Sequence, residues 1–276
     1  MPLAVCATPI GNLEDVTLRV LRELAEADVV LCEDTRHTKG LLDRHGIAAR
    51  LLSYHRHNEA QRTAELLPRL ERGERIALVS DAGLPGVNDP GARLIGAALE
   101  AGIPVTVLPG PSAVETALVS SGLAGERFQF LGYLPRGEKA LAALWAELAS
   151  WPHPAVAFES PRRLPATLRS LAAALPDRPV AVCRELTKRF EEVSRGTPVE
   201  LADRFADPPK GEITLVVGGR GAEAAQVEPG EALVLPLAAV VELVAAGVPR
   251  RQAADVVARL ARVSRNTLYS ESLKSR

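Results

Sequence analysis

Short runs of Val, Ala and Leu alternate with stretches of helical periodicity through the first part of the chain. The apolar runs predict strands at Leu3–Ala7, Val29–Cys32, Ile76–Val79 and Val105–Leu108. The intervening stretches predict helices over residues 15–27, 38–45, 59–72 and 90–101, several of which stop at a glycine. Strand and helix in regular alternation are typical of an α/β domain built on a mostly parallel sheet.

A second unit starts near Ser112, where PGPSAVETALVSSG predicts a loop that leads into a helix. Strands are expected at residues 128–131, 155–158, 180–184, 192–195 and 213–217, with helices over 141–148 and 164–175. Some of these strands have no helix between them, so we expect a mixed sheet. Residues 218–230 have a linker composition, and only helices are expected from Leu233 onwards. We therefore predict α/β domains at residues 1–115 and 116–220 and a helical module at 232–276.

Composition excludes several other classes of protein. Hydrophobic residues make up 47% of the chain, enough for a proper core, and the net charge of −1 means that any nucleic-acid surface must be a local patch. Cys6, Cys32 and Cys183 lie in separate apolar runs, which favours buried thiols over a disulfide framework or a zinc site. We expect no metal, no membrane span and no signal peptide, and hence a cytoplasmic protein.

The segment Ser80–Gly91, SDAGLPGVNDPG, is the most informative loop. It follows an apolar strand directly and leads into a helix, with Asp89 expected as the N-cap and Pro90 as the first helical residue. Its glycines allow close approach of a ligand, and the helix N-terminus offers free N–H groups to an anion. Loops at the carboxyl ends of parallel strands are where α/β sheets bind ligands, and a tight turn alone would need far fewer residues.

This loop matches neither the dinucleotide fingerprint nor the phosphate loop of nucleoside triphosphatases. A second compact turn, Pro109–Ser112, ends the following strand. If the two strands are neighbours in the sheet, the two loops open on the same side and can share one ligand.

An ordered set of motifs extends these observations: ATPIGNLEDVTLR, CEDTRHT, SDAGLPGVNDPG, LPGPSA, FLGYLPR, FESPRR, RELTK with FEE and RGT, and KGE. Over roughly residues 3–217 the chain resembles the ribosomal RNA small subunit methyltransferase I family, which is tetrapyrrole-methylase-like. The resemblance implies S-adenosylmethionine bound in a cleft between two α/β domains, and a homodimer. It also implies 2′-O-methylation of a cytidine, position 1402, in the decoding region of 16S rRNA in the small ribosomal subunit.

The same resemblance implies which residues line the methyl-donor pocket. In the first domain these are Pro9, Gly11, Ser80, Asp81, Ala82, Gly83, Pro85, Gly86, Asp89, Pro90, Ser112 and Ala113. From the second domain they are Ser160, Leu186, Gly211, Glu212 and Ile213. Leu84 departs from the family pattern, in which a threonine is usual, and this puts a hydroxyl contact to the donor in doubt.

A ribose hydroxyl is a poor nucleophile until it loses its proton, so a base or a strong orienting group is expected. The candidates are Glu33, Asp34, His37, Glu185 and Lys188, of which we take Glu33, Asp34 and Lys188 as the predicted catalytic set. The acids are equally consistent with salt bridges to Arg36 or Lys188.

Residues 36–57 carry five Lys or Arg, one acid and four of the five histidines, and Tyr54 offers a face for base stacking. The predicted RNA contacts are Arg36, His37, Lys39, Arg136, Arg162 and Arg163, with further phosphate contacts possible from Lys139, Lys188 and Arg189. Arg44 and Arg50 are equally consistent with a solvated helix face.

The tail is also basic, with seven Lys or Arg and two acids over residues 245–276. PRRQAADVVARLARVSRNTLY predicts two short helices around a tight turn, as in a helix-turn-helix. This module is equally consistent with a subunit-docking element and with a plain helical cap. Two other functions stay open: a tetrapyrrole or diphthine-type methylase of the same fold, and a DNA-binding regulator built on the tail.

Overall fold

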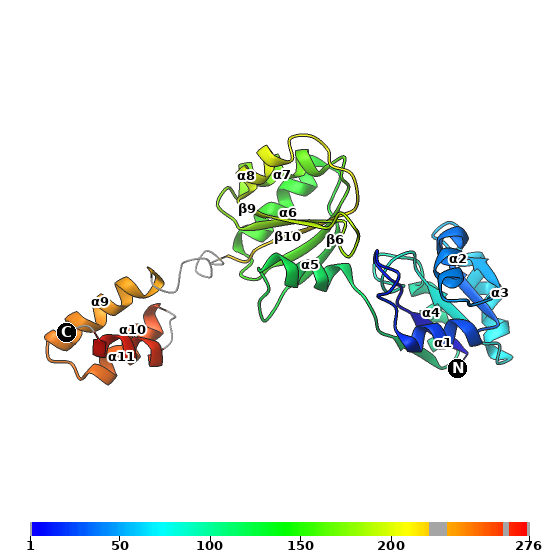
Figure 1. The fold of residues 1–276 in the computed structure, drawn as a ribbon, viewed down its shortest axis with the longest axis horizontal. Coiled ribbons are helices and arrows are strands. Elements are labelled where there is room, and N and C mark those ends of the chain that lie inside the picture. Colours follow the sequence, from blue (N-terminus) through cyan, green and yellow to red (C-terminus); the bar gives the residue numbers. More distant parts are fainter. Residues whose placement is uncertain (1, 221–230, 262–264, 275–276) are drawn as a thin grey trace. The chain divides into compact units, whose positions relative to one another are not determined.

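The structure is a computed structural model that describes residues 2–220, 231–261 and 265–274 (Figure 1). The chain divides into two compact units, residues 1–219 and 220–276. The first unit contains two separate five-stranded sheets with helices, which confirms the predicted α/β fold.

The first sheet is wholly parallel, with strand order β3-β2-β4-β1-β5. Its strands are β1 (Leu3–Cys6), β2 (Val29–Cys32), β3 (Leu51–Ser53), β4 (Ile76–Val79) and β5 (Val105–Leu108). The three central strands are buried along their whole length, as expected for a parallel sheet covered on both faces. The predicted strands are confirmed. Sequence analysis missed β3, because three residues at a sheet edge are too few to show a periodicity.

Helices cover both faces of this sheet, and successive residues of each strand face opposite helices. On one face, Leu3 and Val5 of β1 pack with α3 (Glu59–Glu71) and α4 (Ala92–Glu100). On the other face, Ala4 and Cys6 pack with α1 (Leu18–Glu26) and α2 (Thr35–Arg44). This arrangement explains why the strands are apolar at every position.

The starts of α2 and α4 differ from the prediction for a local reason. Helix α2 begins at Thr35, because the Asp34 carboxylate caps it by accepting the Arg36 N–H. Helix α4 begins at Ala92 with Gly91 as its N-cap at φ 139°. The prediction that Asp89 caps this helix and Pro90 opens it is therefore wrong: the loop continues for two more residues.

The second sheet has the order β6-β7-β10-β8-β9 and is mixed, as predicted. Only β6 and β7 are parallel among its pairs. Its strands are β6 (Gln129–Tyr133), β7 (Ala155–Glu159), β8 (Val180–Arg184), β9 (Glu192–Gly196) and β10 (Ile213–Val217). Its helices are α5 (Ala113–Ser121), α6 (Glu138–Ser150), α7 (Leu164–Ala174) and α8 (Pro198–Arg204). Helix α8, which a Thr197–Glu200 capping box starts, was missed.

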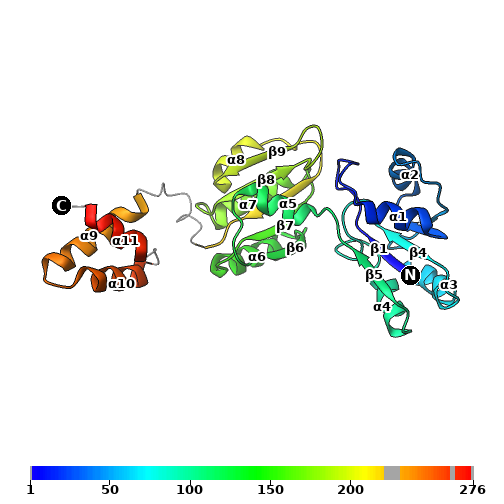
Figure 2. The same cartoon turned by 60° about the horizontal axis from the view of Figure 1, so that its bottom comes forward.

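Helix α5 packs on the second sheet, against β7, β8, β9 and β10 (Figure 2). Ile10, from the loop after β1, lies in the same apolar cluster as Val114 of α5 and Leu186. The predicted boundary at residues 115/116 thus falls inside a helix that belongs to the second sheet. The two sheets of the first unit also share a packed junction.

The second unit consists, in its described residues, of α9 (Glu231–Ala245), α10 (Arg250–Ala261) and α11 (Arg265–Lys274). Val240, Ala254 and Leu268, one from each helix, belong to its apolar core. The prediction of a helical tail is confirmed for this part of the chain, and most of the predicted linker lies outside the described residues. No helix in the described ranges is long and apolar enough to cross a membrane.

Candidate functional site

The Ser80–Gly91 loop is tied to the end of β1 by hydrogen bonds. Thr8 and Gly83 form an isolated antiparallel bridge, with N–O distances of 2.9 and 3.0 Å. The buried Thr8 hydroxyl also donates to the Ser80 carbonyl at 2.9 Å. These bonds fix the first half of the loop at the carboxyl edge of the sheet, which is the edge where ligands bind in α/β proteins.

Glycines give this loop its path. Gly83, Gly86 and Gly91 have φ angles of 78°, 86° and 139°, which lie in the region that favours glycine. At Gly86 an added Cβ would lie 3.7 Å from the amide nitrogen of Ala92, the first residue of α4. At the N-cap of α4 the Gly91 N–H donates to the Glu59 carboxylate at 2.9 Å, so this amide already has an anionic partner within the fold.

The loops after β1, β4 and β5 meet at this edge. Strands β4 and β5 are not neighbours, because β1 lies between them. The turn after β5 nevertheless reaches the same place: an added Cβ on Gly110 would lie 2.8 Å from the Ala7 Cβ. An added Cβ on Gly83 would lie 3.7 Å from the Pro111 carbonyl. Three loops, rather than two neighbouring ones, thus border the candidate site.

The predicted second-domain residues also converge on one edge of their sheet. The register pairs Ile213 with both Glu159 and Arg184, which brings Ser160, Leu186 and the start of β10 together. The Glu185 N–H donates to the Glu212 carbonyl at 3.0 Å, and the Glu212 N–H donates to the Glu185 carboxylate at 2.9 Å.

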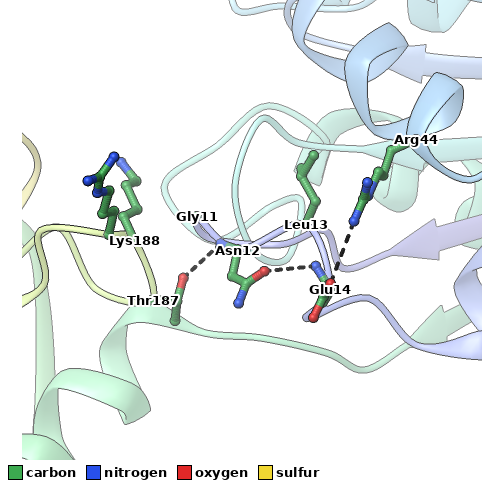
Figure 3. A pocket seen from close by; sticks show the side chains of 8 residues that line it. Gly11, Asn12, Leu13, Glu14, Arg44, Thr187 and Lys188 are labelled. Atoms are coloured by element: carbon green, nitrogen blue, oxygen red, sulfur yellow. Dashed lines mark hydrogen bonds and ion pairs between the residues drawn. The ribbon is translucent and has the colours of Figure 1, made fainter.

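The two sheet edges meet where Asn12 contacts Thr187 (Figure 3). The Asn12 N–H donates to the Thr187 hydroxyl at 3.0 Å. A Cβ on Gly11 would lie 2.5 Å from Lys188 Cγ, so only glycine allows this approach. Beside the junction is an open pocket of about 610 Å³, whose lining is Gly11, Asn12, Leu13, Glu14, Arg44, Thr187, Lys188 and Arg189.

Carboxylates gather at the ends of β2 and β4. Strands β2 and β4 run in register, so Asp34 and Asp81 follow them side by side, and the Asp34 N–H donates to Asp81 Oδ1 at 3.1 Å. Burial and the charge of Asp81 raise the pKa of Glu33. Burial, followed by the charge of Glu33, raises the pKa of Asp89 to about 6.

The other predicted catalytic groups are engaged within the fold. A hydrogen bond from Arg36 lowers the pKa of Asp34 to about 2. The Lys188 ammonium donates to Glu185 at 3.0 Å and to Glu212 at 2.9 Å. Burial alone would lower the pKa of Lys188, but these bonds raise it on balance, so the side chain is held as a cation.

The predicted RNA contacts have different environments. Arg36, His37, Lys39, Arg136 and Arg162 are exposed. Arg163 instead donates to the carbonyls of Leu134 and Pro135 and pairs with the fully buried carboxylate of Glu159. The prediction of Tyr54 as a stacking face is wrong: its side chain is 1% exposed, and its hydroxyl lies 3.2 Å from that of Thr63. The residue follows an edge strand but turns inward to the α3 and α4 layer.

The three cysteines are free and buried, as predicted. Burial raises the pKa of Cys6 to about 12 and that of Cys183 to about 11, so these thiols are not reactive groups.

Leu84 packs against the apolar cluster under α3 and α4, where a hydroxyl would have less to contact. Across the residues that the structure describes, no group of His, Cys, Asp and Glu is arranged to hold a metal ion.

The sequence did not predict the contact between the Ser80–Gly91 loop and the second sheet. Arg56 donates to the Asn88 carbonyl at 2.7 Å. Asn88 has φ 61°, unusual for a residue other than glycine, and a Cβ on Gly132 of β6 would lie 2.9 Å from its Oδ1. The Asn88-Asp89-Pro90 triplet was the available signal, since asparagine tolerates this conformation better than most residues.

Comparison with known proteins places this arrangement in a family. The family model described as "Tetrapyrrole (Corrin/Porphyrin) Methylases" matches residues 2–202. A protein of Mesorhizobium japonicum named "Ribosomal RNA small subunit methyltransferase I" is 45% identical over 99% of this chain and 91% of its own length. The chain belongs to the ribosomal RNA small subunit methyltransferase I family of tetrapyrrole methylases. A family member of the same name from Synechocystis is 42% identical over 99% of this chain and 97% of its own.

Two solved structures share the fold of this chain. Uroporphyrin-III-C-methyltransferase from Thermus thermophilus has a TM-score of 0.56 and 25% identity, over 78% of this chain and 93% of that one. A diphthine synthase has a TM-score of 0.60 at 17% identity, over 78% of this chain and 89% of that one. The second likeness concerns the fold alone.

Proposed function

We propose that this chain transfers the methyl group of S-adenosylmethionine to the 2′ oxygen of a cytidine ribose in 16S rRNA of the small ribosomal subunit. The similarity that carries the proposal extends over nearly the full length of relatives named as small subunit rRNA methyltransferases. The family resemblance implies cytidine 1402 in the decoding region as the target, and we include that position in the proposal.

The residues at the carboxyl edge of the first sheet suit the methyl donor. Gly83 and Gly86 give the loop its path, and backbone amides of the loop would bind the carboxylate of the donor. The Asp81 carboxylate suits its ammonium group. Ser112 and Leu186 would border the same molecule from the other loops. The sulfonium supplies an already activated methyl group, so the protein's task is to align it and to exclude water.

Glu33 is the carboxylate that we propose as the proton acceptor for the ribose hydroxyl. Its pKa is raised, so its carboxylate is a stronger base than an ordinary one. Asp34 is occupied as a helix cap and by Arg36. Lys188 is held protonated between two carboxylates, so it does not serve as a base. It would instead supply a fixed positive charge at the edge of the second sheet.

RNA would approach through the exposed cationic residues near this edge. Arg36, His37 and Lys39 follow β2 on the exposed side of α2, and Arg136 and Arg162 follow β6 and β7. We do not include Arg163, because its guanidinium holds the Leu134–Pro135 backbone in place. We also propose that the protein acts in the cytoplasm and forms a homodimer. Val107 and Val119 expose apolar surface that a second copy would cover.

Methyl transfer to reconstituted small subunits tests this proposal. Radiolabelled S-adenosylmethionine should methylate subunits that lack the modification, and nuclease mapping should find a 2′-O-methylcytidine. Glu33→Gln should lose catalysis by roughly 100-fold or more while S-adenosylmethionine binds normally. The exposed acid Glu138 of α6, replaced by Gln, serves as the matched control and should keep full activity.

Two outcomes would contradict the proposal. Methyl transfer to a tetrapyrrole or a diphthine precursor, without transfer to the small subunit, would make the chain a tetrapyrrole or diphthine-type methylase of the same fold. Sequence-specific binding of duplex DNA without methyl transfer would favour the regulator interpretation.

A further inference from the structure

The turn between β8 and β9 is held in an unusual conformation. Glu185 and Thr187 have φ angles of 51° and 64°, a region that a β-branched residue such as threonine rarely adopts. The turn is closed by hydrogen bonds from the Thr187 N–H to the Glu191 carboxylate at 2.5 Å and from the Lys188 N–H to the Glu185 carbonyl at 3.0 Å. Such strain persists only where the surroundings fix it, and it is concentrated at functional sites.

This turn exposes an aromatic ring next to a cation. The Phe190 side chain is 66% exposed in a chain that has only five phenylalanines. The Arg189 guanidinium lies over the same ring, 5.5 Å from its centroid. The exposed ring contributes little to the core, and its place on a strained turn beneath a guanidinium suggests a surface that binds a partner.

Cationic side chains from both α/β parts of the first unit line the pocket that begins at this turn (Figure 3). Arg44 contributes from α2, and Lys188 and Arg189 contribute from the turn. The ion pair between Arg44 and Glu14 is 3.6 Å long and exposed on both sides, so it is weak and easily exchanged for another anion. The surface therefore combines a flat ring with positive charge.

We propose that Phe190, Arg189 and the adjoining pocket bind a single-stranded segment of the RNA substrate, an assignment that rests on the proposed function. Phe190 stacks on an unpaired base, and Arg189 and Arg44 contact phosphates on either side of it. Proteins recognise single-stranded RNA by this combination of aromatic stacking and arginine contacts. Three cationic residues, Arg44, Lys188 and Arg189, line the pocket with one acid, Glu14, and this excess favours a polyanion over a second copy of this chain, whose net charge is −1.

Variants of the full-length protein test this surface. Phe190→Leu keeps an apolar side chain but removes the ring, and it should weaken binding of a fluorescent single-stranded RNA by roughly fivefold to 150-fold. Phe190→Tyr keeps an aromatic ring and should bind the same RNA with the affinity of the wild type. Arg189→Gln should reduce the slope of log affinity against log salt by about 0.7. Affinity for S-adenosylmethionine should stay unchanged in all three.

Arg204→Gln is the matched control. Arg204 also lies over a phenylalanine ring, but Phe205 is buried, so no base can stack on it. This variant should bind RNA like the wild type.

The outcomes separate this inference from the proposed function. If the wild type methylates small subunits and Phe190→Leu binds RNA and transfers methyl groups equally well, the inference alone is wrong. If Phe190→Leu instead converts a dimer to a monomer in sedimentation with RNA affinity unchanged, the surface joins two copies and the inference is overturned. A wild type that binds RNA but does not methylate it would refute the proposed function and leave this surface as an RNA site.

Discussion

Replacing Asp89 by asparagine should make the protein more stable at neutral pH. The carboxyl is half-buried in the Ser80–Gly91 loop, where burial and then the charge of Glu33 raise its pKa from 3.8 to about 6. The folded state therefore holds this proton more tightly than the unfolded state. Stability falls as pH rises from about 4 to about 6, and above that range the full cost of the charged form is present.

The size of the effect follows from the pKa and the exposure. A rise from 3.8 to about 6 corresponds to roughly 3 kcal/mol for a fully buried group. Because the Asp89 side chain is only half-buried, solvent screening reduces this to about 1 kcal/mol. Asp89→Asn should therefore unfold with a free energy about 1 kcal/mol higher than the wild type at neutral pH, and with no such advantage at about pH 4.

Urea unfolding at a series of pH values measures this difference, with the exposed Asp177→Asn as a control that should follow the wild type. A difference between Asp89→Asn and wild type that does not vary with pH would refute the reasoning. So would a variant that is less stable than the wild type at neutral pH, since the carboxylate would then be a stabilising partner in the loop.

Three further predictions concern the glycine loop and two buried charges. Gly86→Val places a β-branched side chain at φ 86° beside the first amide of α4 and should abolish S-adenosylmethionine binding in calorimetry; normal affinity would remove the loop from the donor pocket. Its control, Gly96→Ala within α4, meets open space and should stabilise the fold by up to about 1 kcal/mol. Arg178→Met removes donors to carbonyls at the end of α6 and at Gly218, and should lower the free energy of unfolding by about 3 kcal/mol; a loss below about 1 kcal/mol would mean that water replaces the guanidinium. Glu159→Gln leaves Arg163 without its buried counter-charge and should cost about 3 kcal/mol in denaturant unfolding, whereas an unchanged midpoint would show that the arginine is adequately solvated.

Several features of the fold could be predicted from the sequence because they depend on local patterns. Apolar runs such as Ile76–Val79 are long enough to mark a strand, and a parallel strand buried on both faces needs no alternation to be recognised. The mixed second sheet followed from strands without intervening helices. By contrast β3, with three residues, and α8, with seven, were too short for a periodicity to appear.

The site was predicted in part. The Ser80–Gly91 loop could be recognised from its glycines and prolines. Glycine permits backbone conformations, and a close approach of the backbone to other groups, that other residues do not. The loop's neighbours were not predictable in the same way: β1 separates β4 from β5, and the order of strands depends on contacts between distant segments. The inward turn of Tyr54 likewise depends on α3 and α4 packing over it.

The sequence by itself determined the longer strands, the main ligand loop and the set of ionisable residues, since each of these is encoded in a short stretch of chain. Only the tertiary structure decided which of these residues are still able to act. In the sequence, nothing separates Asp34, Lys188 and Arg163 from candidate residues such as Glu33 and Arg162. In the structure, the first three are each held by an ion pair or a hydrogen bond. Arg36 and Glu159 lie close in sequence to the side chains that they hold, whereas Glu212 lies 24 residues from Lys188. Which of these pairs form depends on distances in space, because electrostatic and hydrogen-bond energies fall steeply with distance and only the fold sets those distances.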